Sequence, residues 1–113
     1  MPAANKVVRS ADSGMTNPEP GLRRQVMSYS HGIMLVRHKI EPGWVGVAHS
    51  HPHEQLIYVV SGAIQLTVGD RTHTLSAGDS FLVAGGIQHQ ARADRATEVL
   101  DVFAPYRADY ASG

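Results

Sequence analysis

Short apolar runs, each ended by glycine, proline or aspartate, constrain the fold of this chain more than any other feature. The runs are too brief for helices of roughly 10 residues or more, and their length and β-branched content are typical of strands. Many short strands joined by glycine-rich turns predict an all-β sandwich or barrel. The predicted strands lie within residues 32–40, 55–60, 63–68, 72–75, 80–84 and 97–103.

Two dipeptides between these runs have the composition of tight turns. Ser61-Gly62 and Gly69-Asp70 each separate two alternating runs, so both predict β-hairpin turns. The alternation also assigns faces, because successive side chains of a strand point to opposite sides of the sheet. In the last run, Val99, Asp101 and Phe103 are therefore expected on one face.

The chain divides into an N-terminal arm and one domain. Residues 1–21 mix small, polar and helix-breaking residues, which predicts a flexible arm or a swapped strand. Residues 22–113 are expected to form a single barrel domain, with room for a short helix near residues 108–112. The strand at residues 55–60 is apolar on both faces, which indicates burial between two layers or at a subunit interface. We therefore predict a homodimer.

Composition excludes several classes of function. The chain has 113 residues, no cysteine, and 10 basic against 10 acidic side chains. Without cysteine there are no disulfides, thiolate metal ligands or cysteine nucleophiles. A net charge of zero offers no attraction to nucleic acid or to an anionic membrane. No apolar run approaches the ~20 residues of a membrane span, and the first residues lack the apolar core of a secretory signal. We expect a cytoplasmic protein whose partners include neither nucleic acid nor membrane.

The sequence HSHPHEQ, residues 49–55, concentrates polar side chains that can bind a metal. In an extended chain, His49, His51 and Gln55 fall on one face, whereas Pro52 predicts a kink just before His53. Two imidazoles and an amide oxygen suit a divalent metal, although a polar loop would have the same composition. His89 follows a glycine-rich turn and can complete the ligand set.

Three other histidines do not form such a cluster. His31, His38 and His73 stand alone in their segments. An isolated strand histidine is usually structural or exposed, so we expect no direct chemistry from these three side chains.

The spacing of these residues resembles the two motifs of the cupin family. The first motif is matched by Gly43, five residues, His49-Ser50-His51, three residues, Gln55, six residues and Gly62. The second motif is matched by Gly78, five residues, residues 84–86, two residues and His89. This resemblance implies the cupin-type double-stranded β-helix, or jelly-roll, barrel. It also implies that His49, His51, Gln55 and His89 bind one divalent transition metal ion such as Ni, Fe, Mn, Zn or Co.

Three positions depart from the family pattern. Gln55 replaces the usual glutamate, Ala84 replaces a proline, and Ala93 stands in the place of an asparagine. The last two are turn or packing positions. Gln55 is a neutral ligand, so the metal keeps more positive charge, which makes a stronger Lewis acid and a weaker site.

A narrower resemblance links the chain to the small single-domain cupins grouped with the pectin-degradation protein KdgF. It is carried by HSHPHEQLIYVVSG and by a last strand reading EVLDVFAPYRADY. Members of that group open the ring of 4,5-unsaturated uronates to give linear keto sugars. The resemblance implies that Asp101 transfers a proton, that Phe103 shapes the substrate pocket, and that Arg107 binds a substrate carboxylate.

The residues give independent support to two of these roles. An inward carboxylate at Asp101 is costly to bury unless it is paired or protonated, which is typical of acid–base groups. Arg107 follows Pro105 near the barrel rim, and its planar guanidinium suits a carboxylate. The alternative for Asp101 is that it is a buried partner of a local arginine. The alternative for Arg107 is that it is an ordinary surface charge.

The favoured function is a metal-dependent enzyme acting on a small, oxygenated, anionic substrate by ring opening or isomerisation. An iron-dependent dioxygenase is one alternative, because cupins with three histidines leave coordination positions open for oxygen. A non-catalytic cupin that binds a small molecule is the other.

Overall fold

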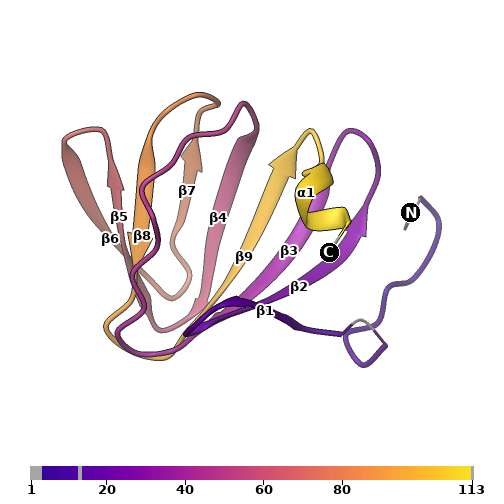
Figure 1. Ribbon diagram of the computed structural model, residues 1–113, viewed down its shortest axis with the longest axis horizontal. Helices are drawn as coiled ribbons and strands as arrows, with labels where there is room; N and C mark the ends of the chain where they lie inside the picture. The colour runs from indigo at the N-terminus through magenta and orange to yellow at the C-terminus, as the bar shows by residue number, and fades with distance from the viewer. Residues whose placement is uncertain (1–3, 13, 113) are drawn as a thin grey trace.

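The computed structural model describes residues 4–12 and 14–112. These residues contain nine β-strands and one short helix. The strands form two antiparallel sheets, a large one in the order β1-β2-β3-β9-β4-β7 and a small one in the order β6-β5-β8. The sheets curve around a common interior as a jelly-roll barrel (Figure 1), which confirms the all-β prediction. The elements are β1 (Thr16–Glu19), β2 (Leu22–Tyr29), β3 (Met34–Ile40), β4 (Glu54–Ser61), β5 (Ala63–Val68), β6 (Arg71–Ser76), β7 (Ser80–Val83), β8 (His89–Arg92), β9 (Thr97–Ala104) and α1 (Ala108–Ala111).

An irregular backbone segment between β3 and β4 closes one side of the barrel. Residues 43–49 run antiparallel to β8, and Gly46 N donates to Ala91 O at 2.9 Å. His49 and His89 exchange two backbone hydrogen bonds of 3.0 and 2.8 Å. Directly opposed residues of an antiparallel pair point to the same face. The pairing therefore brings the side chains of His49 and His89 together.

One of the two predicted hairpins is wrong. Gly69-Asp70 does join paired strands, with Val68 opposite Arg71. Ser61-Gly62, in contrast, joins β4 to β5, and these strands lie in different sheets: β4 pairs with β7 and β9, and β5 with β6 and β8. A glycine with positive φ suits a crossing between sheets as well as a hairpin, so turn composition does not identify the partner of a strand.

The inward faces of β3 and β9 carry polar side chains between apolar ones. Alternate residues of both strands are buried, as the pattern at Val99, Asp101 and Phe103 predicts. One apolar cluster fills the barrel, and a second lies where Tyr106 and Tyr110 pack against the large sheet. The buried residues of the two strands are Met34, Val36, His38, Ile40, Thr97, Val99, Asp101 and Phe103.

The outer face of β4 is apolar and exposed in the single chain. Leu56, Tyr58 and Val60 retain 42%, 44% and 41% of their accessible surface, and the neighbouring Leu82 retains 56%. Burial of this face between two layers of one chain, one of the two alternatives, is therefore wrong. The predicted homodimer, in which a subunit interface covers these side chains, stays a prediction.

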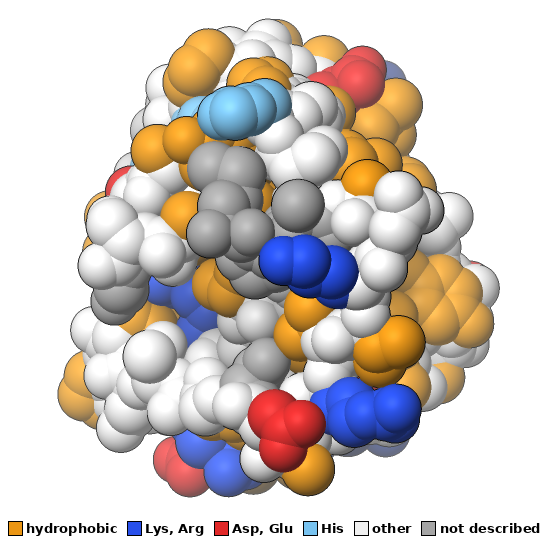
Figure 2. Space-filling view, turned by 90° about the vertical axis from the view of Figure 1, so that its right-hand side faces the viewer, with side chains coloured by type: hydrophobic (Ala, Val, Ile, Leu, Met, Phe, Trp, Pro, Cys, Tyr) orange, Lys and Arg blue, Asp and Glu red, His pale blue; other side chains and the backbone are white. Residues whose placement is uncertain are grey.

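The N-terminal part of the chain adds strand β1 to the edge of the large sheet. Thr16–Glu19 pairs with β2 of the same chain, and Gln25 Nε2 donates to Ser10 O at 2.8 Å. Strand β2 itself was not singled out from the sequence, because charged residues interrupt its apolar pattern. On the face seen in Figure 2, basic, acidic and hydrophobic side chains are interspersed without a patch of one charge. No helix in residues 4–12 and 14–112 has the length and apolarity to cross a membrane.

Gly62→Ala is expected to lower the free energy of unfolding by at least about 2 kcal/mol, because φ is +78° and a Cβ would collide with Ala96 O and the Thr97 side chain. Gly69→Ala is the matched control, since its φ is +61° and nothing lies within 4 Å of its Cβ. Chemical denaturation measures both variants. Equal losses in the two variants would contradict the crowding at Gly62.

Candidate metal centre and cavity

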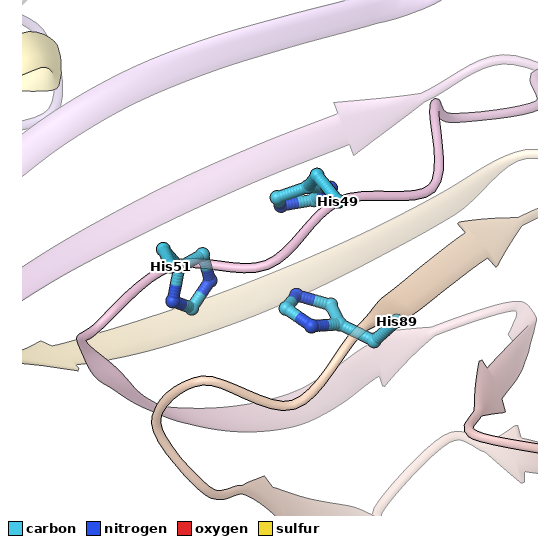
Figure 3. A group of neighbouring side chains, drawn as sticks. All are labelled: His49, His51 and His89. Atoms are coloured by element: carbon cyan, nitrogen blue, oxygen red, sulfur yellow. The ribbon is translucent and has the colours of Figure 1, made fainter.

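Three histidines converge at one end of the barrel interior. His49 and His51 lie on the segment that precedes β4, and His89 begins β8. One ring nitrogen from each lies within 4.8 Å of the others. The ring centres are 4.5 Å apart for His49 and His89 and 4.9 Å apart for His51 and His89. Figure 3 shows the three imidazoles turned toward a common point.

The backbone sets the tautomer of all three imidazoles. Each Nδ1 lies 2.9–3.0 Å from a carbonyl oxygen two residues away in the chain, which only accepts hydrogen bonds. Nδ1 therefore carries the proton, and Nε2 keeps its lone pair for the interior. The pairs are His49 with Val47, His51 with His53, and His89 with Ile87.

Two lone pairs of this cluster meet no hydrogen-bond donor within the described residues. His51 Nε2 lies 3.0 Å from Gln55 Oε1, so two acceptors face each other when His51 Nδ1 holds the proton. His89 Nε2 is buried and meets no hydrogen-bond partner within the described residues. Burial lowers the pKa of both His51 and His89, which opposes a second proton on either ring. Converging lone pairs of three imidazoles and an amide oxygen fit a divalent transition metal ion.

A chain of hydrogen bonds leads from this cluster across four strands. Gln55 Nε2 donates to Asp101 Oδ1 at 2.9 Å, and His38 Nδ1 lies 2.7 Å from Asp101 Oδ2. Arg24 Nε then donates to His38 Nε2 at 3.0 Å. The register explains the contacts, because Asp101 is diagonal to both Gln55 on β4 and His38 on β3.

Residues from the C-terminal helix cover one side of the interior. The guanidinium carbons of Arg24 and Arg107 lie 3.7 and 3.9 Å from the centre of the Tyr110 ring, within the range of cation–π contacts. Arg107 also pairs with Asp109 at 2.8 Å and donates to the Tyr110 hydroxyl at 3.0 Å. The hydrogen bond from Arg107 lowers the pKa of Asp109, and burial raises the pKa of Tyr110.

A cavity of about 220 Å³ joins the histidine cluster to this cover. Its apolar wall includes Ile57 and Leu66, and Trp44 lines it close to Gly46. The Trp44 indole N–H donates to Glu19 Oε1 at 2.7 Å, which fixes the ring at the wall. The cavity therefore combines an apolar surface with a few convergent polar groups, as small-molecule sites do.

The structure brings all the predicted site residues together. Six of them line the cavity, and His51 completes the histidine cluster: the six are His49, Gln55, His89, Asp101, Phe103 and Arg107. Sequence reasoning set His38 aside, yet its imidazole contacts Asp101. The alternation in residues 34–40 places His38 on the inward, apolar face of β3 and was the signal available for finding it.

The family model for the cupin domain matches residues 36–103. The chain therefore belongs to the cupin family. It is 26% identical over 92 residues to the pectin degradation protein KdgF of Dickeya dadantii (strain 3937), covering 80% of this chain and 84% of that protein.

Two solved structures resemble the chain over nearly its whole length. The structure of KdgF from Halomonas sp. is 31% identical with a TM-score of 0.88, covering 93% of this chain and 97% of that one. An RmlC-like cupin from Shewanella frigidimarina NCIMB 400 is 30% identical with a TM-score of 0.91, covering 97% and 99%.

Divalent metal is expected to stabilise the protein through the histidine cluster. Metal at 100 times its dissociation constant adds about 2.7 kcal/mol to the free energy of unfolding, because it binds the folded state. His89→Ala should lose this gain, whereas His73→Ala, at a strand position outside the cavity, should keep it. Melting curves with added Ni, Fe, Mn, Zn or Co and metal analysis of the purified proteins measure the effect. An equal gain in His89→Ala would place the metal elsewhere.

Proposed function

We propose that this cupin is a metal-dependent enzyme that opens or isomerises the ring of an unsaturated uronate sugar. The relation to two KdgF proteins supports this substrate class, since one of them is described as a pectin degradation protein. The anionic substrate agrees with the two arginines, Arg24 and Arg107, that line the cavity.

The observation that carries the proposal is the placement of Asp101. The residue is 4% exposed and lines the cavity, and its carboxylate accepts a hydrogen bond from Gln55 of the predicted ligand set. Oδ1 accepts one hydrogen bond from Gln55, and Oδ2 accepts one from His38. Each oxygen retains a further lone pair for a proton. A carboxylate held in this way beside a metal site is suited to acid–base chemistry.

The reaction is an isomerisation, so one proton leaves the substrate and one is returned. A divalent metal held by His49, His51, Gln55 and His89 would polarise a ring or carbonyl oxygen of the substrate. Asp101 accepts the proton from the anomeric hydroxyl as the bond to the ring oxygen breaks. The ring oxygen leaves as an enolate oxygen, and Asp101 returns its proton to the enolate carbon, which gives the ketone and restores the starting state of Asp101.

Arg107 is proposed to bind the carboxylate of the uronate. Three of its five N–H groups are used by Asp109 and Tyr110, so two remain for a ligand. Phe103 is only 1% exposed and forms part of the same pocket. The centre of its ring lies 5.2 Å from the guanidinium carbon of Arg107. Its aromatic ring is proposed to limit the shape of the substrate.

Asp101→Asn is expected to keep the metal and to lower turnover of a 4,5-unsaturated uronate by about 100-fold or more, the usual contribution of general acid–base catalysis. Glu98→Gln is the matched control, because Glu98 lies on the same strand and pairs with Arg37 at 3.0 Å outside the cavity. Turnover and metal content are measured together. Normal turnover in Asp101→Asn would refute the assigned role.

Arg107→Met is expected to raise KM for the uronate about 10-fold or more, because a charge-assisted hydrogen bond contributes about 1.5–3 kcal/mol. Arg71→Met, on the exposed start of β6, serves as the control. Steady-state kinetics on the uronate measures both variants. An unchanged KM in Arg107→Met would remove Arg107 from substrate binding.

The two alternative functions give different results in the same assays. An iron-dependent dioxygenase would consume oxygen in the presence of Fe(II) and substrate, and ring opening would not. A non-catalytic cupin would show no turnover with any of the tested metals.

A further inference from the structure

His38 is a buried histidine that the proposed reaction does not use. Its side chain lies on β3, is nearly enclosed, and lines the cavity two strands away from Gln55. It is not a member of the histidine cluster that holds the metal ligands. Both of its ring nitrogens are engaged, one with Asp101 and one with Arg24.

The two contacts assign the proton of this imidazole. Arg24 Nε, which is always a donor, points at His38 Nε2 from 3.0 Å, so Nε2 must accept. The ring proton then lies on Nδ1, which donates to Asp101 Oδ2 at 2.7 Å. The two contacts therefore direct the Nδ1–H group of His38 at the carboxylate and the Nε2 lone pair at Arg24.

Arg24 is itself held in place from the other side. Its guanidinium carbon lies 3.7 Å from the centre of the Tyr110 ring, so the C-terminal helix orients it toward His38. Arg24 also lines the cavity. The sequence of contacts thus runs from α1 through β2 and β3 to the carboxylate on β9.

The geometry points to His38 as a positioning residue for Asp101, with Arg24 setting its tautomer. Gln55 and His38 each donate to a different oxygen of Asp101, which fixes the rotation of the carboxylate about its last torsion angle. Gln55 belongs to the predicted metal ligand set, and His38 does not. This arrangement presents the remaining lone pairs of Asp101 to the cavity in one orientation. The effect of His38 on turnover rests on the proposed role of Asp101 in proton transfer, whereas its tautomer does not.

The tautomer can be measured without any substrate. Long-range proton–nitrogen NMR spectra of the full chain, loaded with diamagnetic Zn²⁺, distinguish a protonated ring nitrogen from one with a free lone pair. The His38 signals are identified by their loss in His38→Leu. We expect a neutral ring with the proton on Nδ1. A proton on Nε2, or on both nitrogens, would overturn the proposal whether or not turnover is found.

Kinetics of three variants tests the positioning role. His38→Leu should lower kcat for the uronate by about 10- to 100-fold, as is typical when a supporting hydrogen-bond partner is removed. KM and metal content should hardly change, because neither the ligands nor Arg107 are altered. His38→Asn should recover most of kcat, since its amide can donate from the place of Nδ1, and His38→Gln should not. His73→Leu is the control for loss of a strand histidine outside the cavity.

The NMR and kinetic experiments together separate failure of this inference from failure of the proposed function. Wild-type kcat in His38→Leu would overturn the positioning role while leaving the enzyme assignment intact. A loss of kcat that His38→Asn and His38→Gln share equally would also overturn it, because it would indicate a purely structural role. Absence of turnover in the wild-type protein would reject the proposed function, and the NMR tautomer would then decide the inference about His38.

Discussion

The backbone pairing of residues 43–49 with β8 is the constraint on which the whole site depends. It converts what would be a long loop into an irregular strand, and its final pair is His49 with His89. His49 and His89, two predicted metal ligands 40 positions apart in the sequence, are thereby fixed opposite each other. His51 follows two positions later, so its side chain can return to the same space. The histidine cluster is therefore a consequence of how the barrel closes.

Gln55 gives the departure from the cupin motif a physical explanation. Its amide offers an oxygen to the histidine cluster and an N–H to Asp101, so it belongs to both groups at once. A glutamate in its place would present a carboxylate to the carboxylate of Asp101, and like charges at that distance disfavour each other's ionisation. The amide avoids this repulsion and gives Asp101 a hydrogen-bond donor beside the predicted ligand set. With glutamine in place of glutamate, the predicted ligand set has one anionic ligand fewer, and Asp101 has one more fixed hydrogen-bond donor.

The sequence predicts the parts of this structure that follow from local rules. Alternation correctly places Asp101 and Phe103 inward, and motif spacing correctly groups the histidines with Gln55. Local patterns do not show which strand pairs with which, so the composition of the turn at Gly62 wrongly predicts a hairpin. The same limitation explains why the sequence predicts no direct chemistry for His38. Its importance arises from the register between β3 and β9, a relation between residues 63 positions apart that no local pattern contains.

The indole at the cavity wall gives the protein a built-in optical probe. Trp44 is the sole tryptophan of the chain, and a hydrogen bond to Glu19 and the close approach of Gly46 hold its ring in one place. Its fluorescence therefore comes from a single, oriented chromophore that borders the cavity. A molecule entering that space displaces solvent next to the ring, and the emission responds with no background from a second indole. Titration of unlabelled protein with candidate ligands can follow occupancy directly, before any product has been identified.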